Sequence, residues 1–269
     1  MPKPLDWDDH ITIAGACRPV PALDYDPPPT LVKFLEAGPK PIYIGFGSIV
    51  DRDPGALTNI ILEAIEMADV RSVISRGWSQ LGAMKGIPEN ICLVDDIPHE
   101  WLFQDRVSCV VHHGGAGTTF AGLRAGLPTV IVPFFGDQYF WGDMVYIAGA
   151  GPCQLARKSL SAQLLAETLT MALNGSCRSA AAGIAAKLNV DDGAANFVEA
   201  FHVRLPADAM RCSLDPSRAA VWKLSTHSKR GFKLSTFAAS VLLKQGCIDS
   251  KKLERSVHFV TLTGNESRC

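Results

Sequence analysis

The stretch Val111-His-His-Gly-Gly-Ala-Gly-Thr-Thr119 follows a short apolar run and opens a segment with helical spacing. A glycine-rich turn from strand to helix is typical of parallel α/β sheets. Its glycines let the backbone approach a ligand closely, and the helix N-terminus offers unpaired amides and a positive dipole to a phosphate. Thr118 and Thr119 can add hydroxyl donors, and His112 a ring donor. Close packing alone can also require such glycines, so this loop by itself leaves a structural interpretation open.

Outward from this loop, apolar runs alternate with helical segments from residue 41 to about 202. The predicted strands are residues 41–47, 72–75, 91–94, 107–111, 129–132 and 153–155, and the predicted helices are 57–68, 116–125, 137–148, 161–172 and 191–201. Asp53 and Pro54 suit the N-cap and first turn of a helix. Continuous apolar strands joined by helices predict a Rossmann-like parallel sheet with helices on both faces. Ligands of such sheets bind outside the carboxyl ends of the strands.

The loop Val132-Pro-Phe-Phe-Gly-Asp-Gln138 ends the next predicted strand. A carboxylate beside a carboxamide can bind vicinal hydroxyls, because both accept hydrogen bonds and the amide also donates. Asp137 could instead cap the helix behind it, and the two roles do not exclude each other.

Two further loops contain suitable residues. In Asp95-Asp-Ile-Pro-His99, Ile97 and Pro98 could form an apolar shelf for a flat base with His99 nearby, or simply a turn into the next helix. In Gly45-Phe-Gly-Ser48, the serine could donate to a phosphate or cap a turn.

Composition divides the chain into three parts. Residues 1–30 contain five prolines in their second half and predict an extended lead-in. Residues 31–202 hold the predicted sheet. Residues 1–202 carry 14 basic and 22 acidic side chains, a net of −8, whereas residues 203–269 carry 12 and 5, a net of +7. This charge step predicts a separate basic C-terminal extension, which is either a solvated surface or a surface for anionic lipid.

Composition also limits the class of protein. Hydrophobic residues make up 47% and charged residues 20%, an ordinary globular mixture. The N-terminus does not resemble a signal peptide, and no run approaches the ~20 apolar residues of a spanning helix. The eight cysteines are scattered without a Cys-x-x-Cys pair. We therefore expect a cytoplasmic protein, at most peripheral on membranes, with no nucleic-acid partner.

Together these loops resemble the C-terminal donor-binding domain of GT-B glycosyltransferases, specifically of sterol 3β-glucosyltransferases. The resemblance runs from about residue 2 to about residue 254. The motifs that carry it are Pro41–Ile49, Ser75–Trp78, Ile97–Phe103, His112–Thr119, Ala121–Gly126, Pro133–Gly142, Met210–Cys212 and Ala220–Lys223.

The resemblance implies a UDP-glucose donor. Ile97 and His99 would lie at the uracil and ribose, and Asp137 and Gln138 would bind the glucose hydroxyls. The activity implied for the intact enzyme is inverting transfer of glucose to the 3-hydroxyl of a membrane sterol.

The diphosphate would be held by His112, Gly115, Gly117 and Thr118, with Ser48 facing it. Since amides, hydroxyls and imidazole do this work, the resemblance implies neither a metal nor a cofactor.

Members of the resembled family have an N-terminal domain with the acceptor pocket and the catalytic base, and nothing before residue 31 resembles it. The catalytic residues therefore stay unknown, and we expect the base in an acceptor domain that acts in cis or in trans. Two alternatives remain open. One is a catalytically incomplete UDP-sugar-binding fragment or subunit, and the other is a different GT-B protein, such as a lipid-linked N-acetylglucosaminyltransferase or an epimerase.

Overall fold

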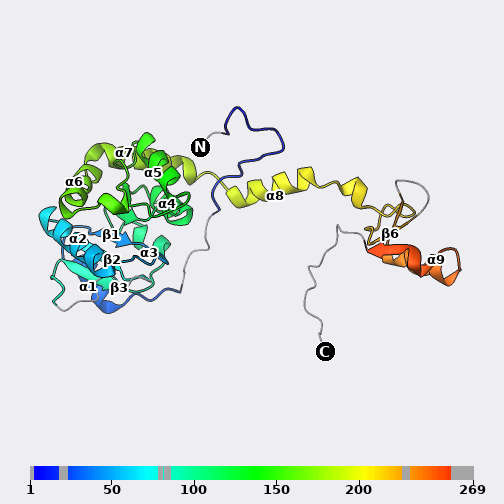
Figure 1. Cartoon of the computed structure of the whole chain (residues 1–269), viewed down its shortest axis with the longest axis horizontal. Coiled ribbons are helices and arrows are strands. Elements are labelled where there is room, and N and C mark those ends of the chain that lie inside the picture. The colour runs from blue at the N-terminus through cyan, green and yellow to red at the C-terminus, as the bar shows by residue number, and fades with distance from the viewer. Residues whose placement is uncertain (1–2, 18–23, 78–80, 82–85, 226–230, 256–269) are drawn as a thin grey trace. The chain divides into compact units, whose positions relative to one another are not determined.

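The computed structural model describes residues 3–17, 24–77, 81, 86–225 and 231–255 (Figure 1). The chain divides into two units, Met1–Phe197 and Val198–Cys269, and helix α8 (Gly193–Arg204) crosses the division. Trp78 of one resemblance motif, part of the Pro-rich lead-in and the end of the basic extension lie outside the described residues.

Five apolar runs of the first unit form one parallel sheet in the order β3-β2-β1-β4-β5, which confirms the predicted α/β class. The strands are β1 (Ile42–Gly45), β2 (Ser72–Ser75), β3 (Ile91–Val94), β4 (Val110–His112) and β5 (Thr129–Ile131). The chain adds β2 and β3 on one side of β1 and then returns to place β4 on the other. The strand order therefore reverses between β1 and β4, where Gly45 pairs with His112.

Helices cover both faces of this sheet. On one face, α2 and α6 pack on Ile42, Ile44 and Val111. On the other face, α1 and α3 pack around Tyr43, while α5 and α7 pack around Ile131. The helices of this unit before α8 are α1 (Pro29–Glu36), α2 (Pro54–Met67), α3 (His99–Phe103), α4 (Ala116–Arg124), α5 (Gln138–Ile147), α6 (Ala162–Ala172) and α7 (Gly175–Leu188), with a 3₁₀ turn at Arg157–Ser159.

Local signals explain where two helices begin. Pro54 occupies the first turn of α2, and the Asp53 carboxylate accepts the Ala56 N–H at 2.9 Å, as the sequence predicts. At α6, the Ser161 hydroxyl accepts the Leu164 N–H at 3.2 Å. The predicted strand at 153–155 is wrong, because only the Leu155 N–H bonds to β5, at the Ile131 carbonyl 2.9 Å away.

Two helices of the first unit were not predicted from the sequence. Helix α1 begins at Pro29, the last of three prolines, so its start was hidden in the lead-in. Helix α7 buries only Ala181 and Ala185, and its alanine-rich sequence has too few large apolar residues to show helical spacing.

The second unit forms a small α/β structure from the basic extension. Its strands β6 (Trp222–Leu224), β7 (Phe232–Leu234) and β8 (Leu253–Arg255) form an antiparallel sheet in the order β7-β6-β8. Helix α9 (Thr236–Lys244) follows β7, and 3₁₀ turns lie at Ala207–Met210 and Ser250–Lys252. Throughout the described residues, every helix is too short or too polar to cross a bilayer.

The turn after β4 gives a stability prediction. Gly114 has a φ of +90°, and a Cβ there would lie 2.9 Å from the Gln138 carbonyl oxygen, whereas a Cβ at Gly117 would meet nothing within 4 Å. Gly114→Ala should therefore cost about 2 kcal/mol from strain and crowding, lowering the Tm of the first unit by roughly 4–8 °C. The matched variant Gly117→Ala should leave the Tm unchanged or raise it. Scanning calorimetry of both variants checks this, and equal Tm values would contradict it.

Candidate functional site

The loops that follow four of the five strands meet at the switch point. A Cβ at Gly47, after β1, would lie 3.7 Å from the His113 ring, and one at Gly77, after β2, would lie 2.6 Å from the Gly47 carbonyl oxygen. A Cβ at Gly114, in the loop after β4, would lie 2.9 Å from the carbonyl oxygen of Gln138, in the loop after β5. Gly47 and Gly77 have φ values of +58° and +53°, so glycine is required at both positions. Three of the four loops predicted to form a site, those after β1, β4 and β5, are therefore brought together.

The role predicted for His112, a ring donor to a phosphate, stays a prediction, and its buried Nε2 has no hydrogen-bond partner among the described residues. His112 ends β4 and is fully buried. Its Nδ1 accepts the Gly114 N–H at 2.9 Å, so the ring shapes the glycine loop. Burial lowers the pKa of His112 to about 3, and the ring is neutral. The alternation of strand side chains places His112 on the same buried face as Val110, and this signal was available in the sequence.

His113 is the imidazole that faces the meeting loops, and the sequence interpretation passed over it. It is only partly buried, and its Nε2 would lie 2.5 Å from a Cβ at Gly115. Its Nδ1 is buried without a hydrogen-bond partner among the described residues. Burial lowers the pKa of His113 although the Asp137 carboxylate opposes this, so the ring is neutral near pH 7. A neutral imidazole offers one donor to a ligand.

Helix α4 begins directly behind His113. Gly115 is its N-cap and has no side chain to occupy the first-turn amides. Gly117 is exposed and Thr118 partly exposed in that first turn. Thr119 is buried, and its hydroxyl donates to the Gly115 carbonyl at 2.9 Å, so it is not available to a ligand. An anion at this end of the helix would meet amides, a hydroxyl and an imidazole, and the contacts predicted for Gly115, Gly117 and Thr118 stay predictions.

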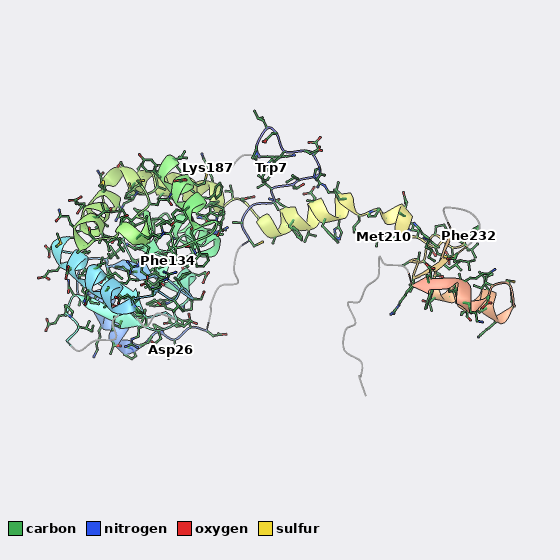
Figure 2. All side chains as sticks on the ribbon, viewed as in Figure 1. Trp7, Asp26, Phe134, Lys187, Met210 and Phe232 are labelled. Atoms are coloured by element: carbon green, nitrogen blue, oxygen red, sulfur yellow. The ribbon has the colours of Figure 1, made fainter. Side chains whose placement is uncertain are left out.

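Asp137 and Gln138 have different surroundings. The Asp137 carboxylate is exposed and accepts the Trp141 indole N–H at 3.0 Å, and it makes no side-chain cap at the start of α5. Gln138 is buried, and its Oε1 accepts the backbone N–H groups of Phe134 and Phe135 at 2.7 and 3.1 Å. Phe134, labelled in Figure 2, also packs edge-on against Phe46, with ring centroids 5.5 Å apart. Gln138 therefore holds this loop, and only its amide N–H groups remain for a sugar.

The loop after β3 is held by side chains that pack in the core. The side chain of Ile97 is buried in the core, so it does not form the exposed shelf that was predicted; Pro98 is partly exposed. The His99 Nε2 lies 3.2 Å from the Tyr43 hydroxyl, and its ring stacks on Phe103 with centroids 4.6 Å apart. Burial lowers the pKa of His99, against the nearby acidic side chains, and raises that of Tyr43 to about 12. Both groups are neutral and fix this loop beside β1.

Ser48 is exposed in the loop after β1, as its predicted place beside a phosphate requires. The same loop is held by Asp51, which is 8% exposed and bonds Arg157 Nε at 2.7 Å and Nη2 at 3.0 Å. Burial alone would raise the pKa of Asp51, but the hydrogen bonds of Arg157 and the Asp53 N–H, with the charge of Arg157, hold it below its usual value.

Metal-ligating side chains do not gather at this site. Asp51-Arg-Asp53 has the spacing of a carboxylate pair, but Asp51 bonds Arg157 and Asp53 caps α2. In the described ranges, three or more His, Cys, Asp or Glu side chains nowhere converge as they would around an ion. Independence from metal stays a prediction.

Comparison with known proteins places these loops in a family. Residues 59–200 match the family described as erythromycin biosynthesis protein CIII-like, C-terminal domain. Over 216 residues, the chain is 44% identical to sterol 3-beta-glucosyltransferase UGT80A2 of Arabidopsis thaliana. That alignment covers 80% of this chain and 34% of UGT80A2, so the chain spans about a third of its relative's length.

Solved structures agree on the fold. The match to a crystal structure of the glycotransferase of kitacinnamycin covers 71% of this chain and 48% of the glycotransferase chain, with 20% identity and a TM-score of 0.56. The match to the structure of Arabidopsis thaliana UGT89C1 complexed with UDP-L-rhamnose covers 63% of this chain and 44% of UGT89C1, with 18% identity and a TM-score of 0.51. The five-stranded sheet is thus the fold of the C-terminal half of GT-B glycosyltransferases.

The Asp51–Arg157 pair gives a prediction about stability and pH. Asp51→Asn leaves the partly buried Arg157 guanidinium without its carboxylate and should cost about 2 kcal/mol at pH 7, a Tm decrease of roughly 4–8 °C. Because the pKa of Asp51 is lowered on folding, the stabilisation exists above the unfolded pKa of about 3.9 and is lost as the pH falls through the folded value. The Tm difference between wild type and Asp51→Asn should therefore shrink below about pH 4.

The control is Asp95→Asn, which breaks the exposed ion pair with Arg76 at 2.8 Å. Such a pair should contribute less than about 1 kcal/mol. Thermal melts from neutral to acidic pH compare the two variants, and similar Tm decreases at pH 7 would contradict a positioning role for Asp51.

Proposed function

Because the chain belongs to the EryCIII-like C-terminal domain family of glycosyltransferases, we propose that it is the donor-binding domain of a sterol glucosyltransferase. It binds UDP-glucose for inverting transfer of glucose to the 3-hydroxyl of a membrane sterol. The observation that carries the proposal is the approach of Gly47 to His113 and of His113 to the exposed start of α4, at the β1–β4 switch point. There the diphosphate lies against the α4 amides, which stabilise the negative charge of the departing UDP.

The remaining parts of the donor follow from neighbouring loops. The uracil and ribose lie over Pro98 and the backbone beside Ile97 and His99. Asp137 accepts hydrogen bonds from glucose hydroxyls. The next residue, Gln138, donates its amide N–H groups to the same sugar. The identity to a plant sterol 3-beta-glucosyltransferase favours a sterol as the acceptor.

Transfer requires groups beyond these. The sterol oxygen attacks the anomeric carbon as the bond to the diphosphate breaks, and a base takes the hydroxyl proton. His112 is buried and His99 partly buried, and their rings bond the Gly114 N–H and the Tyr43 hydroxyl, so neither is assigned as the base. We assign the acceptor pocket and the base to an acceptor domain that acts in cis or in trans.

Donor binding should not need a metal. Two substitutions should distinguish the contacts to the diphosphate from the contacts to the sugar. His113→Ala should weaken UDP and UDP-glucose alike, because it removes a hydrogen bond to the shared diphosphate, by about tenfold to a hundredfold. Asp137→Ala should weaken UDP-glucose and leave UDP unchanged. Calorimetry in EDTA measures both ligands.

The matched control is His202→Ala, which removes an exposed imidazole of α8 and should leave both affinities unchanged. Binding that appears only after Mg²⁺ or Mn²⁺ is added would refute the metal-independent site. Equal weakening of both ligands by Asp137→Ala would refute its contact with the sugar.

Residues 1–269 alone should bind the donor without transferring its sugar. Holding donor, acceptor and base in one geometry can supply about 7–11 kcal/mol of the barrier, and this chain is assigned only the donor. Radiolabelled transfer from UDP-glucose to ergosterol in liposomes tests this, with the chain alone and with the N-terminal half of a related enzyme added. Sterol glucoside formed by the chain alone, above a His113→Ala control, would place the base within these residues.

A further inference from the structure

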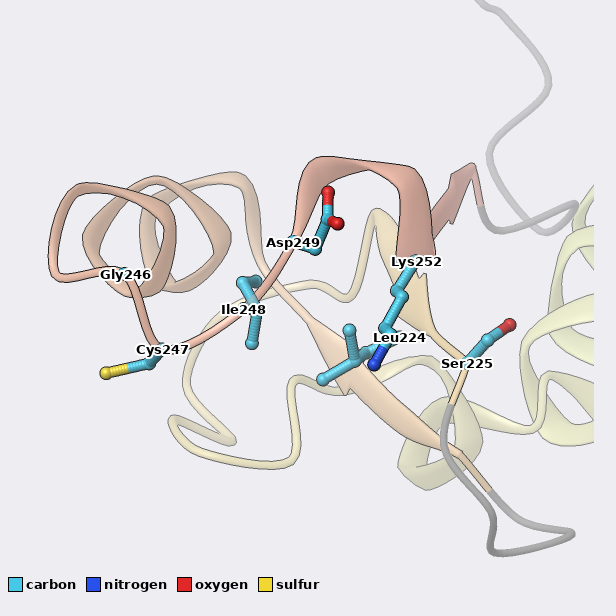
Figure 3. Close-up of a pocket in the computed structure, with 7 residues that line it drawn as sticks. All are labelled: Leu224, Ser225, Gly246, Cys247, Ile248, Asp249 and Lys252. Carbon is cyan, nitrogen blue, oxygen red and sulfur yellow. The ribbon is translucent and has the colours of Figure 1, made fainter.

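The second unit has an open pocket of about 780 Å³ (Figure 3). It lies between the end of β6, the turn after α9 and the 3₁₀ turn before β8. Leu224 and Ile248 form an apolar floor, and Figure 3 shows their side chains directed toward each other. The Lys252 ammonium lies beside Leu224 in the same view. The pocket thus combines an apolar surface with a positive charge.

The apolar floor continues onto an exposed aromatic ring. Leu224 pairs with Phe232 on β7 and with Leu253 on β8, and residues directly opposite in an antiparallel sheet lie on the same face. Phe232 is 50% exposed. A phenyl ring beside a charged pocket suits the boundary between headgroups and acyl chains.

Lys252 and Asp249 both line the pocket, and a second lysine, Lys251, adjoins Lys252 in the sequence. Lys252 and its neighbour Lys251 are exposed, and neither ammonium has a hydrogen bond or ion pair among the described residues. The Asp249 carboxylate accepts the backbone N–H of Lys251 at 2.9 Å. Glu254 accepts a hydrogen bond from Ser225 at 3.3 Å.

The rest of the unit also has an excess of basic side chains. Arg211 and Arg218 pair with Asp208 and Asp215. In the described part of residues 205–255, the acidic side chains outside these pairs are Asp249 and Glu254. The basic ones are Lys223, Lys233, Lys244, Lys251, Lys252 and Arg255.

We propose that this pocket binds the headgroup of an anionic phospholipid in a bilayer. The phosphate pairs with the ammonium groups of Lys251 and Lys252, the glycerol region covers Leu224 and Ile248, and Phe232 enters the interface. The site would bring the donor domain to the membrane that contains the sterol, a purpose that rests on the proposed function. The lipid contact itself follows from charge complementarity and the exposed ring.

The test is co-sedimentation of the full chain with phosphatidylcholine vesicles, with and without phosphatidylserine. Wild type should bind only the anionic vesicles, and binding should weaken as salt rises. Lys251→Gln/Lys252→Gln should weaken binding about fivefold for each charge removed. The control Lys158→Gln/Lys187→Gln removes the same charge from exposed positions of the first unit and should bind almost as wild type does. Equal losses in both double variants, or equal binding to both vesicle types, would overturn the proposal.

A second pair tests the ring. Phe232→Ser should weaken vesicle binding, whereas Phe197→Ser, at a 61% exposed position of the first unit, should not. UDP-glucose binding, measured on the same samples, should be unchanged in all four variants. Wild type that binds vesicles but not UDP-glucose would refute the donor function and leave the lipid site standing. The reverse result would refute only the lipid site.

Discussion

The pairing of β1 with β4 is the constraint on which the site depends. It places Gly45 opposite His112 and so starts two loops, far apart in sequence, from neighbouring strand ends. With β2 and β5 on either side, the loops at Gly77 and Gln138 must approach the same point. A Cβ would collide with neighbouring backbone at Gly77 and Gly114, and Gly47, Gly77 and Gly114 all have positive φ values that favour glycine. The candidate site is therefore built largely from backbone.

This construction determines how an anion can be held. Residues 1–202 have a net charge of −8, and burial lowers the pKa of the three histidines nearest the switch point. Attraction for a diphosphate must then come from amide dipoles at the start of α4 and from neutral donors such as His113. Because these groups are fixed by the fold, they need little reorganisation when charge develops on a leaving group. Lowered histidine pKa values also make the site insensitive to pH near neutrality.

The sheet could be predicted from the sequence because its strands are buried on both faces and appear as unbroken apolar runs. The hydrophobic pattern did not predict elements that bury small or polar residues, such as α7, which buries Ala181 and Ala185. The site was predicted by loop but not always by side chain. His112 and Gln138 carry functional groups suited to ligands, yet one acceptor of each already serves its loop: the His112 Nδ1 accepts the Gly114 N–H, and the Gln138 Oε1 accepts those of Phe134 and Phe135. Such bonds depend on the three-dimensional path of each loop, which periodicity does not describe.

The fold orients the Asp137 carboxylate and leaves most of its hydrogen-bond positions free. This carboxylate accepts one hydrogen bond from Trp141 at 3.0 Å, and a carboxylate has about four acceptor positions. Since the side chain makes no cap at α5 and stays exposed, positions remain for two vicinal hydroxyls. Trp141 in turn is held edge-on by Phe120 and Phe140. Aromatic packing therefore fixes the direction of the Asp137 carboxylate, and under the proposed function the selection of a sugar would depend on this packing as well as on the carboxylate itself.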